Sequence, residues 1–501
     1  MADFGFKKGS LGLAMISNLF SVTVSALVSF VISKYLIETA GSLTYQYYPI
    51  ATNFANYFAI VFIAVNDLSA RFVMVSLLEE RNQEAKEYYS SVLLADLFLS
   101  ALLTAVFAVF VLNIEHILNI PAGIVPEVKQ LFSWLLMSVI VNALTNVYGI
   151  SMYARNRMDI KAVIDLIISF SKLVCFLAFM YMHRLTIVSY GFVLFFAAVV
   201  HLLLNILATK LLLPDFHFDR RMFSMSKIGD LTRSGFWVMI NRIGLMLINN
   251  AQLIIVNIFL GAETSAPLSL VQTLYQFGSL FFFSVEVILQ PLIVKLLVSK
   301  IDDIAGKMLL LQEIVVMFIV IPCTLMMGFG GSFYRLWLPG ENHSVLYILS
   351  WLNLSQLLLT YISTVYTSSM TALNKVKVPS IAMLVIGCFS LLLIFLTLKF
   401  TNLGTVGILL ANNLTYLLYY VVFLPYYAGK QMDGIRTHLS VLVTTAGMFA
   451  ALNTAAGRIL IPNGYIALFA YCIVLELLGC ALVLLLTRTK PQALIRFFAE
   501  R

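Results

Sequence analysis

One long apolar segment of the chain ends on Val147-Tyr148-Gly149-Ile150-Ser151-Met152-Tyr153-Ala154-Arg155-Asn156-Arg157, and a second ends on Val365-Tyr366-Thr367-Ser368-Ser369-Met370-Thr371-Ala372-Leu373-Asn374-Lys375. Further upstream, Ser133-Trp134-Leu135 recurs as Ser350-Trp351-Leu352. The offset is 217 residues at the start and 218 at the end, so one inserted residue reconciles the two copies. Tryptophan, tyrosine and asparagine in matching order are not generic features of apolar sequence. They indicate that the chain contains an internal duplication.

The composition is typical of a membrane protein. Hydrophobic residues make up 61% of the 501 residues, charged residues only 11%, and no stretch is polar enough to form a separate soluble domain. The five cysteines lie inside apolar runs without the pairing of a metal site, so we expect neither a metal nor a cofactor. The net charge of +8 could suggest nucleic acid, but in a membrane protein excess Lys and Arg sets the topology. We therefore expect no nucleic-acid partner.

Fourteen stretches are long enough to cross a bilayer, which takes roughly 20 helical residues. They are residues 11–33, 45–66, 90–112, 130–152, 162–182, 187–209, 235–260, 267–294, 308–329, 345–371, 380–398, 405–426, 438–457 and 464–486. With the N-terminus in the cytoplasm, 24 of the 32 Lys and Arg residues fall in inner loops. This bias follows the positive-inside rule and predicts that both termini are cytoplasmic.

The duplication divides these spans into two like-oriented halves. We expect a first lobe over residues 1–212, a cytoplasmic amphipathic linker over 213–234 and a second lobe over 235–427, followed by two appended spans and a tail over 428–501. The prediction is an all-α polytopic protein with two parallel six-helix lobes, a two-fold axis along the membrane normal and a cleft between the lobes.

Ionisable residues inside spans are the sharpest functional signal, because each costs a few kcal/mol unless it faces a partner or an aqueous cavity. Lys172 lies about halfway along the fifth span and Arg242 about two turns into the seventh, where the repeat aligns it with Asn18. Two cations in one cavity would repel each other without an anion between them. An Arg fork and a Lys point charge suit a pyrophosphate.

Acidic residues offer an alternative interpretation of the same pair. Asp165 and Glu286 could each neutralise one of the cations, so that Lys172 and Arg242 only hold helices together. Either acid is also a candidate site for a coupling proton or Na⁺. Asp96 is expected close enough to the inner face to be solvated.

Polar residues around these charges are candidates for the wall of the cavity: Asn249, Gln252, Gln272 and Tyr275. Amides and tyrosines suit hydroxylated ligands such as sugars, but they also join membrane helices to one another.

The two parallel bundles, the basic linker, the repeated Met-x-Ala-x-Asn-Arg/Lys motif and the two appended helices resemble the polysaccharide-transporter branch of the multidrug/oligosaccharidyl-lipid/polysaccharide exporter superfamily. That branch contains the Wzx-type O-antigen and capsule repeat-unit flippases and is similar in architecture to the lipid II flippases. The resemblance implies a flippase, not an enzyme. It would move polyprenyl-pyrophosphate-linked oligosaccharide from the inner to the outer leaflet by alternating access, coupled to a cation gradient.

The resemblance also implies a bacterial inner-membrane location and a monomer. A glycan polymerase or chain-length machinery is a candidate partner. Two other functions compete with this one. A cation-coupled multidrug exporter of the same superfamily would place acids in the cleft. A membrane glycan polymerase would need a substantial outer loop with catalytic groups, and the predicted outer loops are short.

Overall fold

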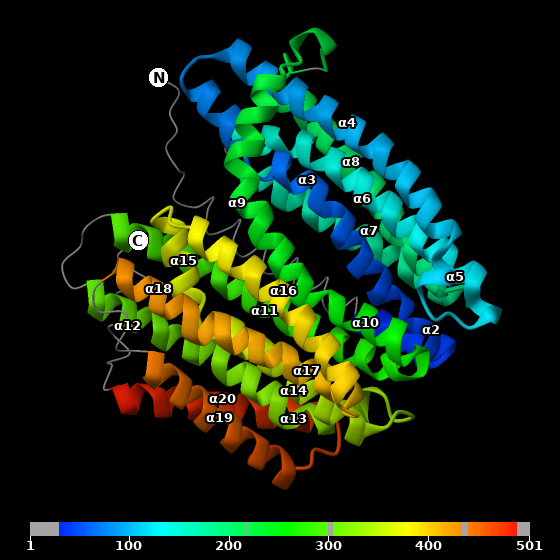
Figure 1. The fold of residues 1–501 in the computed structure, drawn as a ribbon, viewed down its shortest axis with the longest axis vertical. Coiled ribbons are helices and arrows are strands. Elements are labelled where there is room, and N and C mark those ends of the chain that lie inside the picture. Colours follow the sequence, from blue (N-terminus) through cyan, green and yellow to red (C-terminus); the bar gives the residue numbers. More distant parts are fainter. Residues whose placement is uncertain (1–29, 156, 217, 299–303, 433–438, 488–501) are drawn as a thin grey trace. The chain divides into compact units, whose positions relative to one another are not determined.

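The computed structural model describes residues 30–155, 157–216, 218–298, 304–432 and 439–487 of the chain. Almost all of these residues are helical, and no β-strand occurs among them (Figure 1). The all-α prediction is therefore confirmed. The predicted first span lies outside the described residues except for its last turn, and so does Asn18.

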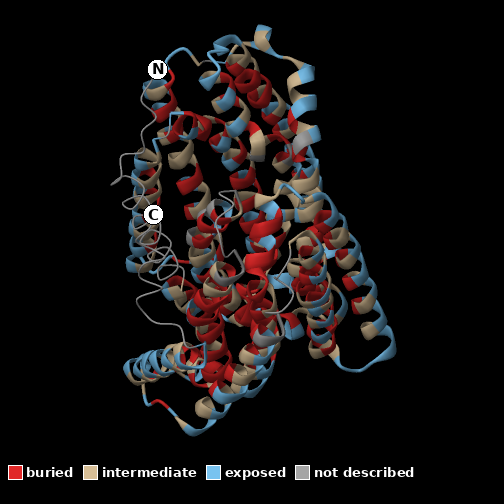
Figure 2. Ribbon diagram, turned by 90° about the vertical axis from the view of Figure 1, so that its left-hand side faces the viewer, coloured by how far each residue is buried: buried red, intermediate tan, exposed pale blue. Residues whose placement is uncertain are grey.

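Twelve helical segments of the described chain are long and apolar enough to cross a membrane. They match the predicted spans except the first and residues 438–457, and helix α19 (Leu439–Ile459) covers the latter. Buried and exposed residues follow different faces of the helices (Figure 2). Many of the exposed side chains are large hydrophobics, such as Leu477, Leu478 and Leu485 of α20 (Tyr465–Thr487). Apolar outer faces of this kind belong in lipid, and the protein is an integral membrane protein.

Cα packing divides the chain into two compact units, residues 1–266 and 267–501. In the first unit, residues 30–40 are helical, and they are followed by α2 (Ser42–Tyr45), α3 (Tyr47–Leu78), α4 (Asn82–Leu112), α5 (Ile114–Ile117), α6 (Val125–Ala154), α7 (Met158–Tyr181), α8 (Ile187–Leu212), α9 (Met225–Asn249) and α10 (Ala251–Leu260). Helix α6 is central: it packs against α8 on one side and α3 on the other, and it also contacts α4 and α7 (Figure 1).

Packing places α9 and α10 in the first unit, although the repeat counts residues 235–260 as the opening span of its second copy. Helix α9 packs against α3 and α4, and hydrogen bonds to earlier residues of the first unit add to these contacts. The Tyr57 hydroxyl of α3 donates to the Met246 carbonyl of α9 at 2.9 Å. Near the end of α10, the Asn119 side chain donates to the carbonyls of Asn257 and Ile258, at 2.6 and 2.9 Å.

The segment between α8 and α9 lies within the predicted linker. The last residues of that linker form the first turns of α9. It contains the short 3₁₀ helix η2 (Arg220–Met222), and the Ser224 amide donates to the Ser91 hydroxyl of α4 at 2.9 Å. Lys227 follows in α9 and forms an ion pair with Glu84 of α4. Burial lowers the pKa of Lys227 and the Glu84 carboxylate raises it; the ion pair prevails, and the pKa lies above the ordinary value.

The second unit is built around α13. Its helices are α11 (Ala262–Val298, from Pro267 onward), α12 (Ile304–Val315), the π-helix η3 (Val316–Val320), α13 (Ile321–Trp337), α14 (His343–Ile362), α15 (Thr364–Ala372), α16 (Lys377–Phe400), α17 (Gly404–Tyr416), the π-helix η4 (Leu417–Phe423), α18 (Leu424–Gln431), α19 and α20. Helix α13 packs against α14, α19 and α20. Its approach to α19 is so close that a Cβ on Gly328 or Gly457 would overlap the backbone of the other helix.

The two copies of the repeat end at equivalent helix termini. Helix α6 ends at Ala154 and α15 ends at Ala372, which are 218 residues apart as the repeat requires. The first copy is one continuous helix, whereas the second is interrupted at Ser363, between α14 and α15. The offset changes from 217 to 218 between Ser355 and Val365. The inserted residue therefore falls where the second helix is interrupted.

The residues that the two copies of the repeat share at their ends form a C-terminal helix cap. In the second copy the Lys375 amide donates to the Met370 carbonyl at 2.9 Å, and Asn374 has a φ of 55°. This closure needs a residue in the left-handed region after the last turn, and asparagine is second only to glycine there. The first copy has the corresponding bond, from Arg157 to Met152 at 2.8 Å. The basic residue also suits the negative end of the helix dipole.

Candidate functional site

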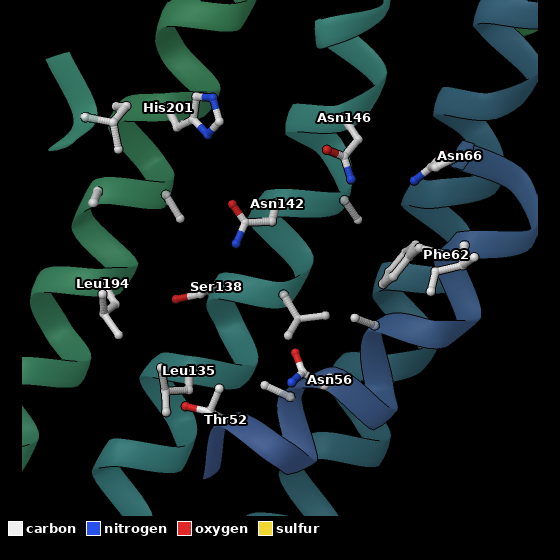
Figure 3. Close-up of a pocket in the computed structure, with 18 of the residues that line it drawn as sticks. Thr52, Asn56, Phe62, Asn66, Leu135, Ser138, Asn142, Asn146, Leu194 and His201 are labelled. Atoms are coloured by element: carbon white, nitrogen blue, oxygen red, sulfur yellow. The ribbon is translucent and has the colours of Figure 1, made fainter. Parts of the chain in front are cut away.

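A cavity of about 390 Å³ lies inside the first unit, among α3, α6, α7 and α8. Its polar lining consists of Tyr48, Thr52, Asn56, Asn66, Ser138, Asn142, Asn146, Lys172 and His201. Side chains from α3, α6 and α8 point into the same space (Figure 3). The volume lies within the range of small-molecule pockets in proteins.

Helical periodicity explains why these polar residues line one space. On α6, Ser138, Asn142 and Asn146 are spaced four residues apart and therefore share one face. Thr52 and Asn56 repeat the same spacing on α3. Apolar residues pack the helices together in the buried group of Phe62, Leu103, Phe107, Leu136, Val139 and Ala143, and three of these, Phe62, Val139 and Ala143, also line the cavity.

Three of the four amides that line the cavity are free to bind a ligand. Asn56, Asn142 and Asn146 are exposed and form no hydrogen bond with another described residue. A carboxamide offers two donors and an acceptor oxygen, so it can bond a hydroxyl group in either sense. Three such groups on two helices form a wall that suits a ligand rich in hydroxyls.

Lys172 of α7 lines this cavity and has no salt bridge with a described residue. Asp165 forms no salt bridge with Lys172, although the two charges still interact at longer range. Lys161 binds the Asp165 carboxylate at 2.6 Å, and His201 Nε2 lies 3.8 Å from its other oxygen. None of the described residues that line the cavity is a carboxylate. Lys172 therefore lines the cavity without a salt bridge to a described residue, with His201 as the second basic group.

The structure does not bring Arg242 to the same cavity. Arg242 is exposed on α9, which packs against α3 and α4, whereas Lys172 lies on α7, which packs against α8 and α6. Arg242 is not among the lining residues, and it forms no salt bridge with a described residue.

The other predicted site residues lie elsewhere. Asn249 is half-buried at the end of α9, and Gln252 is buried in α10; neither lines the cavity. Gln272 and Tyr275 belong to α11 in the second unit, buried and half-buried respectively. Glu286 is half-buried further along α11.

Asp96 corrects a sequence-based expectation. It is fully buried in α4 and not solvated. The reason is the length of the helix: α4 begins at Asn82, before the apolar run at residue 90, so Asp96 lies roughly 20 Å from its start. The cavity amides were missed as well, although their spacing of four residues inside apolar spans was a readable signal.

Comparison with solved structures identifies the fold of the described chain. No protein-family model matches the chain. Its described fold is that of the MATE and MurJ transporters. The structure of the lipid II flippase MurJ in an inward closed conformation aligns with a TM-score of 0.69 over 95% of this chain and 99% of that one, at 15% identity. An inward-facing multidrug resistance MATE family transporter of the MOP superfamily aligns with a TM-score of 0.65 over 86% and 99%, at 13% identity.

One relative is similar to this protein in sequence over most of the chain. The uncharacterized membrane protein EpsK of Bacillus subtilis (strain 168) is 25% identical over 437 residues, which cover 84% of each chain.

Proposed function

We propose that this protein is a transporter of the MOP superfamily that flips polyprenyl-pyrophosphate-linked oligosaccharide from the inner to the outer leaflet by alternating access. The observation that carries the proposal is the cavity of the first unit, with three amides that bind no described residue, one lysine without a salt bridge and no carboxylate in its described lining. The structural likeness to the lipid II flippase MurJ supports it.

The chemistry of the cavity fits the two parts of such a headgroup. Lys172 supplies a point charge to a diphosphate, and a charge-assisted hydrogen bond there is stronger than a neutral one. Asn56, Asn142 and Asn146 supply paired donors and acceptors to sugar hydroxyls. A cationic drug would need a carboxylate in place of Lys172, which weighs against the multidrug exporter.

The same proposal gives the protein its place in the cell. It works in the bacterial cytoplasmic membrane with both termini in the cytoplasm, as a monomer, and delivers its substrate to a glycan polymerase or chain-length machinery. The bias of Lys and Arg toward the inner loops supports this orientation.

The test compares two lysine variants in proteoliposomes that contain a fluorescent polyprenyl-pyrophosphate-linked oligosaccharide. Lys172→Ala is expected to lower the initial flipping rate at least tenfold, since Lys172 is the only lysine among the described residues that line the cavity. Lys210→Ala is the matched control, because Lys210 is exposed near the end of α8, outside the cavity. Equal rates for both variants, at equal amounts of reconstituted protein, would contradict the anion-binding role of Lys172.

A further inference from the structure

A buried carboxylate lies directly behind the cavity. Asp96 of α4 has an exposed fraction of 0%, and its Oδ2 accepts a hydrogen bond from Asn66 Nδ2 at 2.8 Å. Among the described residues this is its only hydrogen-bond partner, and Asp96 Oδ1 has none. Asn66 itself lines the cavity. Asp96 is therefore separated from the cavity by one side chain.

No described cation compensates Asp96. The elements packed against α4 are α3, α6, α9 and η2. Their basic residues are exposed or engaged with other groups: Arg71, Arg220, Arg221, Arg233 and Arg242 are exposed, Lys129 binds Glu115, Arg155 binds the Leu212 carbonyl and Lys227 binds Glu84.

The titratable groups of α4 itself are also distant along the helix. Glu84, Lys86, Glu87, Tyr88 and Tyr89 all lie in its first two turns, at least seven residues before Asp96. At 1.5 Å per residue this is roughly 10 Å or more along the helix axis. No ion pair joins any of them to Asp96.

Electrostatics favours the neutral form of such a group. An ionised carboxylate without a counter-charge costs several kcal/mol to bury, whereas the protonated acid loses no charge solvation. A carboxylic acid also pairs well with a carboxamide, because its hydroxyl donates to the amide oxygen while the amide donates back. Asn66 Oδ1 is buried and has no hydrogen-bond partner, like Asp96 Oδ1. A proton shared between these two oxygens would satisfy both.

We propose that Asp96 is a proton-binding site, which holds a proton in the conformation described here and exchanges it with water in the cavity through Asn66. The direct contact with the Asn66 amide nitrogen, a donor, favours a proton over a metal cation at this place. The use of this proton to drive transport rests on the proposed function, whereas its presence on Asp96 does not.

Infrared spectroscopy of the protein in a detergent without ester groups tests the protonation without any substrate. At neutral pH the difference spectrum between the wild type and Asp96→Asn is expected to contain the carbonyl band of a protonated carboxylic acid. Asp165→Asn is the matched control: Asp165 is partly exposed and bound to Lys161, so its difference spectrum is expected to lack that band. A difference spectrum of Asp96→Asn without the band would overturn the proposal.

A transport measurement tests the coupling separately. In proteoliposomes with the fluorescent lipid-linked oligosaccharide, the wild-type flipping rate is expected to respond to an imposed proton gradient, and the response is expected to vanish in Asp96→Asn. An unchanged response in the variant would overturn the coupling role. If the wild type does not flip the probe at all, the proposed function fails, and the infrared result still decides the protonation of Asp96.

Discussion

At the scale of single residues, Lys172 is the predicted pyrophosphate-binding residue that lines the cavity. The sequence singles it out because an amine in the middle of an apolar span is costly without a purpose. The structure adds what the sequence cannot contain: Asp165 forms its salt bridge with Lys161, and Lys172 lines a cavity. The sequence could not decide whether Lys172 and Arg242 line the same cavity, because this depends on which face each helix turns toward its neighbours.

Arg242 therefore supplies a prediction at this scale. Because it does not line the cavity, Arg242→Ala is expected to reduce flipping of the fluorescent lipid-linked oligosaccharide much less than Lys172→Ala. Initial rates in proteoliposomes at equal protein content would show the difference. Equal losses in the two variants would favour the two-cation site suggested by the sequence over a site with one lysine.

The cavity amides show the same limit of sequence-based reasoning. Asparagine in a membrane helix joins helices about as often as it binds ligands. Asn142 and Asn146 stand on a recognisable face of α6, yet only their lack of hydrogen-bond partners among the described residues shows that they are available. Asn413 of α17 is likewise an asparagine inside an apolar span. Its side chain, however, accepts a hydrogen bond from the Ser355 hydroxyl and donates one to the Leu352 carbonyl.

At the scale of helices, hydropathy predicts most of what is seen. Twelve of the fourteen predicted spans coincide with membrane-length helices of the described chain. Hydropathy does not predict helix ends, because polar turns extend α3 to Leu78 and start α4 at Asn82, beyond the apolar runs. The repeat motif does predict an end: in the second copy the Lys375 amide bonds to the Met370 carbonyl, and Asn374 adopts the left-handed conformation of a helix cap.

The crossing of α13 and α19 supplies a prediction for element packing. Gly457→Ala is expected to destabilise the protein by about 1–3 kcal/mol, because the added methyl group overlaps the backbone at Gly328. Thermal unfolding of the purified protein in detergent would measure the effect. Gly447→Ala on the same helix is the control: its Cβ would meet no atom within 4 Å, so the unfolding temperature should stay equal or rise. The same loss in both variants would contradict the close approach.

At the scale of the whole molecule, the proposed function is the transport of a lipid-linked glycan by an internally duplicated helical chain. The duplication, the spans and the fold class follow from the sequence, because they depend on periodic and compositional patterns. The compact units of the structure are residues 1–266 and 267–501, so α9 and α10 pack with the first unit. The packing of α9 against α3 and α4 and contacts such as those of Tyr57 and Asn119 produce this grouping, and no local pattern in the sequence indicates them.

The most direct measurement is reconstitution of the wild-type protein into sealed liposomes with the fluorescent polyprenyl-pyrophosphate-linked oligosaccharide. A quencher that cannot cross the bilayer reports which headgroups are outside. The account predicts that the protein makes inner headgroups accessible, and that the same glycan on a lipid without the diphosphate crosses far more slowly, since it offers no anion to Lys172. Accessibility no greater than in protein-free liposomes would contradict the account.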